Sequence, residues 1–207
     1  MKNIAIIDYG CGNILSLKRA LSKIGYNSDL TRDPDKISKA THLILPGVGA
    51  FGNAMELLKK YNLLSSIKSH GNDGKPLLGI CLGMQLLLSN SYEFGEHEGL
   101  NLIEGSVEKI SDQTKKKIKI PHIGWNKVKF NYMAKEYKKF DGKNFYFVHS
   151  FIAKTTNAKN TIAYSNFSNL KIPSIIKRNN VTGFQFHPEK SHTDGLSLIK
   201  HFCDSDL

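Results

Sequence analysis

A cysteine between two glycines, at the end of an apolar run, is the side chain best placed to act as a nucleophile. Residues 75–85 read Lys-Pro-Leu-Leu-Gly-Ile-Cys-Leu-Gly-Met-Gln, so Cys81 lies between Gly79 and Gly83. A Gly-x-nucleophile-x-Gly segment needs small flanking residues because the chain turns sharply there from a strand into a helix. The turn would also place the sulfur at a helix N-terminus, where the dipole favours the thiolate. The pattern predicts a nucleophilic cysteine; the alternative is a small apolar core residue.

A histidine that could serve as the base for this cysteine follows a short alternating segment near the C-terminus. The segment Phe184-Gln-Phe-His-Pro-Glu189 puts His187 at a strand end and Glu189 two residues further on, beyond a proline. Glu189 can accept a hydrogen bond from the second ring nitrogen and so fix the tautomer of a general base. The alternatives are a surface His–Glu pair, or a metal site formed with His192. We favour the base and expect no metal, because the cysteine turn already needs a base.

A second glycine-rich turn, Pro46-Gly-Val-Gly49, follows another apolar run. The carboxyl ends of neighbouring parallel strands meet at one edge of a sheet, where the sites of α/β proteins form. A turn in this place could direct a backbone N–H at the oxyanion of a tetrahedral intermediate, and the N–H of Leu82 is the natural second donor. The glycine spacing fits neither common phosphate-binding fingerprint, which disfavours a phosphate cradle.

The elements that must position these residues alternate in the first half of the chain. Apolar runs and helical periodicity predict strands at residues 3–8, 42–45 and 77–80, and helices at residues 13–24, 53–69 and 82–90. This order predicts a parallel sheet with helices on both faces. Short strands are predicted at residues 105–110, 117–120, 126–130, 145–149, 160–164, 172–178 and 181–186, before a closing helix at 195–203. Exposed loops are expected around Lys115 and over residues 131–142.

Composition narrows the classes of function. The 207 residues fit a single domain, 1–207, with a full core. The formal net charge is +11, yet only three of the 29 basic residues are arginine, the usual residue for phosphate and base recognition. We therefore expect no nucleic-acid partner and favour a solvated lysine-rich surface, with a basic face for an acidic protein or an anionic substrate as the alternative. No apolar stretch is long enough to span a membrane, and three scattered cysteines favour the reducing cytoplasm.

Taken together, these segments resemble the class I glutamine amidotransferases that use a Cys-His-Glu triad. The similarity runs almost end to end and rests on Asp8-Tyr-Gly-Cys-Gly-Asn13, Leu45-Pro-Gly-Val-Gly-Ala-Phe-Gly52, Gly79-Ile-Cys-Leu-Gly-Met-Gln-Leu-Leu87, Gly99-Leu-Asn-Leu-Ile-Glu-Gly105, Pro121-His-Ile-Gly-Trp-Asn126, Tyr146-Phe-Val-His-Ser150 and Gly183-Phe-Gln-Phe-His-Pro-Glu-Lys-Ser191. Within the class, the chain is similar to the glutaminase subunits of imidazole glycerol phosphate synthases. The resemblance implies an α/β fold with an open, mostly parallel sheet flanked by helices and a strand-rich C-terminal half.

The resemblance also implies a mechanism. Cys81 would attack the side-chain amide of glutamine, His187 would pass the thiol proton to the leaving ammonia, and Glu189 would orient His187. A γ-glutamyl thioester would form, and water would then release glutamate. Backbone N–H groups of Val48 and Leu82 would stabilise the oxyanion, and the peptide at Val48 would rearrange when the partner is loaded. The residues matching glutamine-binding positions are Gly49, Gln85, Glu93, Ser150 and Phe151, the last of which replaces the family's usual tyrosine.

Ammonia in such enzymes passes directly to a second subunit, because an ammonium ion in water is a poor nucleophile. The implied partner is a barrel-shaped cyclase subunit in a heterodimer, which makes imidazole glycerol phosphate and aminoimidazole carboxamide ribotide in histidine biosynthesis; no cofactor is implied. Four residues match the docking face: His122, Trp125, Asn126 and Lys190. For Trp125 a core aromatic is the alternative, since a lone tryptophan fits either place.

Other functions remain open on the sequence alone. The glutaminase could instead feed a sugar amidotransferase that makes acetamidino groups for surface polysaccharides, and the segments Tyr92-Glu-Phe-Gly95 and Lys190-Ser-His-Thr-Asp-Gly195 fit that branch. A catalytically silent scaffold is disfavoured by the intact Cys81, His187 and Glu189. A stand-alone cysteine hydrolase is disfavoured by the docking-type segment at residues 121–126.

Overall fold

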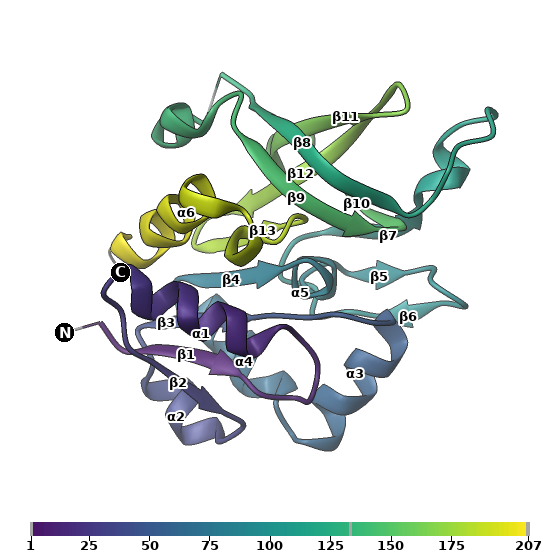
Figure 1. Cartoon of the computed structure of the whole chain (residues 1–207). Coiled ribbons are helices and arrows are strands. Elements are labelled where there is room, and N and C mark those ends of the chain that lie inside the picture. The colour runs from purple at the N-terminus through teal and green to yellow at the C-terminus, as the bar shows by residue number, and fades with distance from the viewer. Residues whose placement is uncertain (1, 133, 206–207) are drawn as a thin grey trace.

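The computed structural model describes residues 2–132 and 134–205. These residues form two sheets: a large mixed sheet flanked by helices, and a smaller second sheet (Figure 1). The large sheet has the strand order β2-β1-β3-β4-β13-β12-β11-β8-β9. Its strands are β1 (Ile4–Ile7), β2 (Ser28–Thr31), β3 (His42–Leu45), β4 (Leu77–Ile80), β8 (His122–Phe130), β9 (Asn144–His149), β11 (Thr161–Phe167), β12 (Leu170–Arg178) and β13 (Val181–Phe184). The half from β2 to β13 is parallel, and β12, β11, β8 and β9 continue it in antiparallel pairs. The predicted α/β class is confirmed.

Helices cover both faces of the parallel half, as predicted. They are α1 (Ile14–Lys23), α2 (Pro34–Lys39), α3 (Phe51–Lys60), α4 (Leu64–Asn72), α5 (Leu82–Leu86) and α6 (His192–Asp204). Strand β1 shows how the layers arise, because its side chains alternate between two cores. Ile4 and Ile6 pack with residues of α1 and α6, whereas Ala5 and Ile7 pack with residues of α2, α3 and α4.

The smaller sheet lies beside the carboxyl end of the parallel strands. Its order is β10-β7-β5-β6, from β10 (Phe151–Thr155), β7 (Gly105–Lys109), β5 (Asn90–Ser91) and β6 (His97–Glu98). Ser150, a predicted glutamine-binding residue, joins β9 of the large sheet to β10 of the small one, so the chain crosses between the sheets at this position. None of the helices in the described part of the chain has the length and apolar character to span a bilayer.

Several predicted elements differ from the structure. The helix predicted at 53–69 is two helices, because Asn62 adopts a left-handed φ of 55° between α3 and α4. The helix predicted from Leu82 to residue 90 stops at Leu86, and the chain then enters β5. Residues 117–120 form no strand; Ile118 and Ile120 instead pack against the small apolar cluster around Ile172.

The lysine-rich segment at 131–142 is not the plain exposed loop that was predicted. It contains a 3-10 turn, Lys135–Phe140, whose two aromatic side chains, Tyr137 and Phe140, are buried. The sequence analysis also missed the short elements β2, α2 and β10, of which β2 and α2 carry mostly polar residues. Of these, β10 matters for function, because it begins at Phe151.

Candidate active site

Cys81 occupies a sharp turn between a parallel strand and a helix, as the sequence predicts. β4 ends at Ile80 and α5 begins at Leu82, and Cys81 has φ 55° and ψ −111°. A non-glycine residue in such a conformation costs on the order of 1–3 kcal/mol and persists only where its surroundings fix it. Here the Cys81 N–H donates to the carbonyl of Phe184 at 2.7 Å, which ties the turn to the end of β13. The turn therefore presents the sulfur at the carboxyl edge of the sheet.

The two glycines around Cys81 are required by close backbone approach. A Cβ on Gly79 would lie 2.5 Å from the carbonyl oxygen of Gly83, so the two ends of the turn pack directly on each other. A Cβ on Gly83 would lie 1.8 Å from the carbonyl oxygen of Leu45, the last residue of β3. The absence of side chains thus brings the cysteine turn against the predicted oxyanion turn that follows Leu45.

Gly83→Ala is expected to destabilise the fold strongly. The new methyl group would meet a backbone carbonyl that cannot move without shifting β3, so we expect a loss of about 3 kcal/mol or more. Gly71→Ala is the matched control: Gly71 is also helical, and its nearest neighbours are mobile methyl groups of Leu102 at 3.1 Å. Urea unfolding of both variants measures the difference, and equal stabilities would contradict the packing argument.

His187 and Glu189 form the pair that the sequence predicts. Nδ1 of His187 lies 2.8 Å from Oε1 of Glu189, and both side chains are almost fully buried. The remaining ring nitrogen, Nε2, and the second Glu189 oxygen, Oε2, are buried without a hydrogen bond of normal geometry among the described residues. Glu189 therefore fixes the ring and leaves Nε2 free to act on the sulfur.

The charge state of His187 is set by competing effects. Burial alone would lower its pKa, but the interactions with the Cys81 thiol and the Glu189 carboxylate outweigh burial and raise the pKa to about 10. The raised pKa favours an imidazolium held between a carboxylate and a sulfur. Such a group can deliver a proton to a leaving amine without first collecting one from solvent.

Ser191 holds the backbone that carries this histidine. Its buried hydroxyl donates to the carbonyl of His187 at 2.6 Å and accepts from the N–H of Tyr146 at 3.0 Å. The N–H of His187 in turn donates to the carbonyl of Tyr146 at 2.9 Å. Two hydrogen bonds thus join strand β9 to the His-Pro-Glu segment, and a third within that segment helps to fix His187 relative to the sheet.

The sequence analysis missed one residue of the site, Gln185. Its side chain is fully buried, with Nε2 3.9 Å from the sulfur of Cys81 and Oε1 accepting from Nε2 of Gln85 at 3.1 Å. The same Nε2 of Gln85 donates to the carbonyl of Phe151 at 3.2 Å. Gln185 therefore connects the nucleophile to two predicted glutamine-binding residues. An alternating strand that buries an amide between two phenylalanines was the available indication.

Gln185→Leu is expected to lower kcat/KM for glutamine by about ten- to a hundred-fold, because Gln85 loses a buried acceptor worth about 1–3 kcal/mol. Leucine keeps much of the volume, so the folded structure should survive. Steady-state kinetics, together with the pH profile of Cys81 alkylation, distinguish a role at the site from general destabilisation. Unchanged kinetics and an unchanged alkylation profile would make Gln185 a packing residue only.

A hydrogen bond from Tyr9 holds the start of the predicted oxyanion turn. The buried hydroxyl of Tyr9 donates to the carbonyl of Pro46 at 2.7 Å, and burial raises the pKa of this tyrosine, so the hydroxyl stays a donor. Beyond the anchor, Gly49 has a φ of 102° and Val48 is 45% exposed. The turn is thus fixed at its start and open at the residue whose N–H is predicted to reach the oxyanion.

The other predicted glutamine-binding residues lie around the same edge. The Glu93 carboxylate accepts from the N–H of Phe51 at 2.6 Å, so it caps α3, directly after the oxyanion turn. The carbonyl of Ser150 accepts from the N–H of Ile110, which fixes the crossing between the two sheets. The Phe151 ring contacts the exposed ring of Phe94 edge-on, with 6.3 Å between the centroids.

The prediction that His122 belongs to a docking face is wrong for its side chain. Strand alternation turns it away from Ile123 and Trp125, and its fully buried ring stacks between Phe147 and Phe167. Its Nδ1 lies 2.9 Å from Nε2 of His149, whose pKa is lowered to about 3, chiefly by burial. His122 therefore supports the sheet beneath the site.

The other three predicted docking residues reach or approach the surface. Trp125 is 45% exposed and stacks on the ring of His192 at 4.7 Å, so the alternative of a core tryptophan is wrong. Lys190 is exposed, with Nζ 5.9 Å from the centre of the Tyr146 ring. Asn126 is half-buried, and its amide contacts His122 and the carbonyl of Asn166. The docking role of these three stays a prediction.

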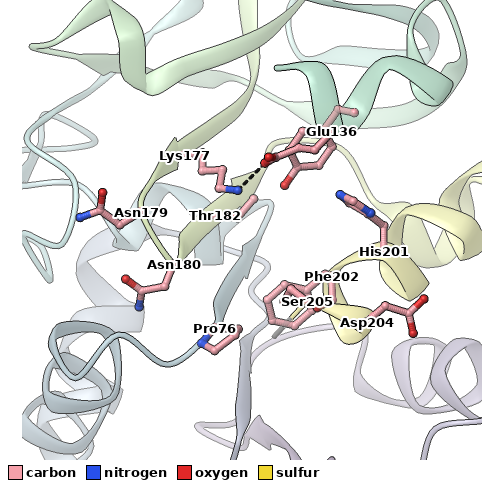
Figure 2. A pocket seen from close by; sticks show the side chains of 11 residues that line it. Pro76, Glu136, Lys177, Asn179, Asn180, Thr182, His201, Phe202, Asp204 and Ser205 are labelled. Carbon is pink, nitrogen blue, oxygen red and sulfur yellow. Dashed lines mark hydrogen bonds and ion pairs between the residues drawn. The ribbon is translucent and has the colours of Figure 1, made fainter. Parts of the chain in front are cut away.

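No group of three metal-ligating side chains that could hold an ion occurs among the described residues. A hollow of about 310 Å³ is present elsewhere, at the opposite end of the sheet (Figure 2). It lies where β4 and β13 begin, next to Pro76 and Asn180, and its Lys177 is paired with Glu136 at 2.5 Å. Because Cys81 follows the carboxyl end of β4, this hollow is separate from the triad.

Comparisons with known proteins agree with this geometry. The family described as "Glutamine amidotransferase class-I" matches residues 5–205. The chain is 43% identical over 204 residues to "Imidazole glycerol phosphate synthase subunit HisH" of Sulfurimonas denitrificans, covering 96% of both chains. It is 44% identical over 211 residues to the protein of the same name from Lactococcus lactis subsp. lactis, covering 99% of both.

Solved structures show the same fold at low identity. "Structure of PurLQS from Thermotoga maritima" superposes with a TM-score of 0.75 at 19% identity, covering 98% of both chains. "Crystal structure of glutamine amidotransferase" gives a TM-score of 0.74 at 18% identity and covers 96% of both. At this identity the likeness supports the α/β fold and says nothing about a substrate.

Proposed function

The chain belongs to the class-I glutamine amidotransferase family, and from that premise we propose that it is the glutaminase subunit of an imidazole glycerol phosphate synthase. It hydrolyses glutamine to glutamate and ammonia, and the ammonia passes to a cyclase subunit of the histidine pathway. The observation that carries the proposal is 43–44% identity to subunits of that name over nearly the whole chain. The cysteine turn with its buried His187–Glu189 pair supplies the chemistry.

The first chemical step is attack by Cys81. The thiolate adds to the side-chain amide carbon of glutamine, and backbone N–H groups of Val48 and Leu82 stabilise the resulting oxyanion. His187, protonated and held by Glu189, then gives its proton to the amide nitrogen as the carbon–nitrogen bond breaks. Ammonia leaves, and the γ-glutamyl group remains on the sulfur as a thioester.

The second step reverses these roles. With ammonia gone, neutral His187 accepts a proton from water, and the hydroxide adds to the thioester carbon. Collapse of this second tetrahedral intermediate releases glutamate and restores the thiolate beside an imidazolium. His187 thus needs to change its charge within each turnover, and Glu189 stabilises the charged form at both stages.

The substrate would be held by residues on both sides of the cysteine turn. Gln85 and Glu93 contact the polar head group, while Gly49, Ser150 and Phe151 provide backbone along the substrate. In the structure Gln85 and Glu93 already make contacts within the protein, to Gln185 and Phe51. Glutamine would therefore add to, or replace, hydrogen bonds that now hold these side chains in place.

A heterodimer with the cyclase subunit, in the cytoplasm, completes the proposal. Trp125, Asn126 and Lys190 would belong to the docking face. The alternative, a glutaminase that feeds a sugar amidotransferase, shares all of the chemistry above. The histidine-pathway assignment is favoured because the near-full-length relatives from Sulfurimonas, Oceanobacillus and Lactococcus all carry the HisH name.

Glutamate release from glutamine tests the assignment. We expect slow release by the purified chain alone and strong stimulation by a histidine-pathway cyclase subunit of the same organism loaded with its nucleotide substrate. Stimulation by the loaded subunit is the expected outcome because the peptide at Val48 must rearrange to complete the oxyanion site. Release that depends on Cys81 but does not respond to the cyclase would move the partner to a sugar amidotransferase.

A further inference from the structure

The antiparallel part of the large sheet carries a groove whose charged side chains are all lysines. The groove has a volume of about 610 Å³ and runs over strands β8, β11 and β12, with β9 at its side. We call it the lysine groove and define it by the following six of its lining residues: Trp125, Lys127, Lys129, Tyr164, Asn166 and Lys171. It lies outside the catalytic site described above.

Strand register explains why these side chains share a face. Along β8, Ile123, Trp125, Lys127 and Lys129 are exposed at alternate positions, as expected for one face of a strand. On the neighbouring strands, Tyr164 pairs with Lys129 and Asn166 pairs with Lys171. On the other side, Trp125 pairs with Tyr146. Lys127 and Lys129 on β8 and Lys171 on β12 therefore project into one surface, on either side of β11, which carries Tyr164 and Asn166.

The lysines of the groove have no acidic partner. No carboxylate lines the groove, and none of the three lysines forms an ion pair among the described residues. The Nζ atom of Lys171 instead lies 3.9 Å from the centre of the Tyr164 ring. Adjacent unpaired cations produce a positive potential that attracts an anionic partner and opposes a basic one.

The aromatic end of the groove continues to the catalytic histidine. The Trp125 and Tyr146 rings contact each other edge-on, with centroids 5.9 Å apart, and Lys190 lies 5.9 Å from the Tyr146 ring. Tyr146 in turn pairs with His187 through a backbone bridge. A protein that sits over Trp125 and Lys190 to collect ammonia would therefore extend onto the lysine groove. Ammonia itself is too small to need such a surface.

We propose that the lysine groove binds an acidic segment of the subunit that accepts the ammonia. This inference rests on the proposed function and specifies the chemistry of the partner surface. A protein is favoured over a nucleic acid because the groove offers lysines, amides and aromatic rings but no arginine, which is the better reader of phosphates and bases. Under this proposal, part of the high net positive charge of the chain serves to bind the partner subunit.

Charge reversal at two of the lysines tests the proposal. Lys127→Glu/Lys171→Glu places two carboxylates in the groove, and Lys115→Glu/Lys117→Glu makes the same change in net charge in an exposed loop. The dissociation constant for the purified histidine-pathway cyclase subunit is measured by calorimetry at low and high salt. We expect the groove variant to bind about ten-fold or more weakly at low salt, with a reduced salt dependence, while the loop variant stays within about two-fold of wild type.

Basal glutamine hydrolysis and the thermal midpoint of each variant are measured in parallel and should match the wild type. Equal cyclase affinity of the two variants would overturn the groove proposal and leave the proposed function intact. A wild-type chain that hydrolyses glutamine but does not bind the cyclase would instead overturn the partner assignment. If the groove variant lost affinity for a single-stranded DNA probe but bound the cyclase as the wild type does, the proposal would be overturned and the groove would be a nucleic-acid surface.

Discussion

Cys81→Ala is expected to abolish glutamine hydrolysis, with a loss of about four orders of magnitude or more in kcat. The expectation rests on the place of the sulfur, which lies at a strained turn, next to His187, at the edge of the sheet where the predicted oxyanion turn begins. In the variant, His187 and Glu189 have only water to activate in place of the thiol. Glutamate release by the purified variant measures the effect.

The cyclase reaction driven by added ammonium salts is the control for this variant. If Cys81 acts only in hydrolysis, the complex containing Cys81→Ala should make its products from ammonia at the wild-type rate. Glutaminase turnover retained in the variant would contradict the mechanism. Loss of both activities would show instead that the substitution damages the complex.

Alkylation distinguishes Cys81 from the other buried thiol without any substitution. Burial raises the pKa of Cys203 to about 12, so this thiol should react slowly below pH 9. Cys81, which lies next to the proposed base His187, should react before Cys203. Mass mapping after brief iodoacetamide treatment at several pH values gives both profiles. Equal rates and equal profiles would argue against an activated cysteine.

The cysteine turn and the contact between His187 and Glu189 could be predicted from the sequence because each depends on local rules. Gly79 and Gly83 indicate a turn at Cys81, because a side chain at either position would collide with the neighbouring backbone. His187 and Glu189 are two residues apart, so a single turn brings them together. Short-range constraints of this kind are present in the order of residues and need no knowledge of the fold.

The parts that could not be predicted depend on long-range packing. The place of Gln185 beside Cys81 and the contact of Glu93 with the start of α3 follow from contacts with residues 104 and 42 positions away in the chain, and the sequence names neither partner. The burial of His122 was missed because its strand begins four residues earlier than predicted, so its place in the alternation was unknown. Likewise, the left-handed Asn62 that separates α3 from α4 lies in a stretch with helical periodicity on both sides.

Removal of Glu189 should have a smaller effect on turnover than removal of His187, and should move the pH profile. His187→Ala loses proton transfer in both steps, worth about 10²- to 10⁴-fold in kcat. Glu189→Gln keeps the ring and a neutral neighbour, so orientation is weakened while proton transfer remains. Steady-state kinetics of both variants give the order, and a larger loss in Glu189→Gln would contradict the assigned roles.

The direction of the pH shift follows from what sets the charge of His187. Burial lowers its pKa, and Cys81 and Glu189 together raise it to about 10, so the amide of Glu189→Gln removes one of the two opposing interactions. The pKa of His187 should fall in the variant. The basic limb of the kcat/KM profile, where the imidazolium is lost, should therefore move to lower pH.

Stability should follow the same titration. A histidine whose pKa is raised on folding contributes stability that is fully present below its unfolded value of about 6.5 and is lost as pH rises through the folded value. For the wild type this loss extends up to about pH 10. In Glu189→Gln the stability contributed by His187 should be lost at lower pH than in the wild type. The difference in unfolding free energy between the two proteins should therefore be larger at pH 6 than at pH 10. Urea unfolding at the two pH values measures it, and a difference that grows with pH would mean that Glu189 does not stabilise the imidazolium.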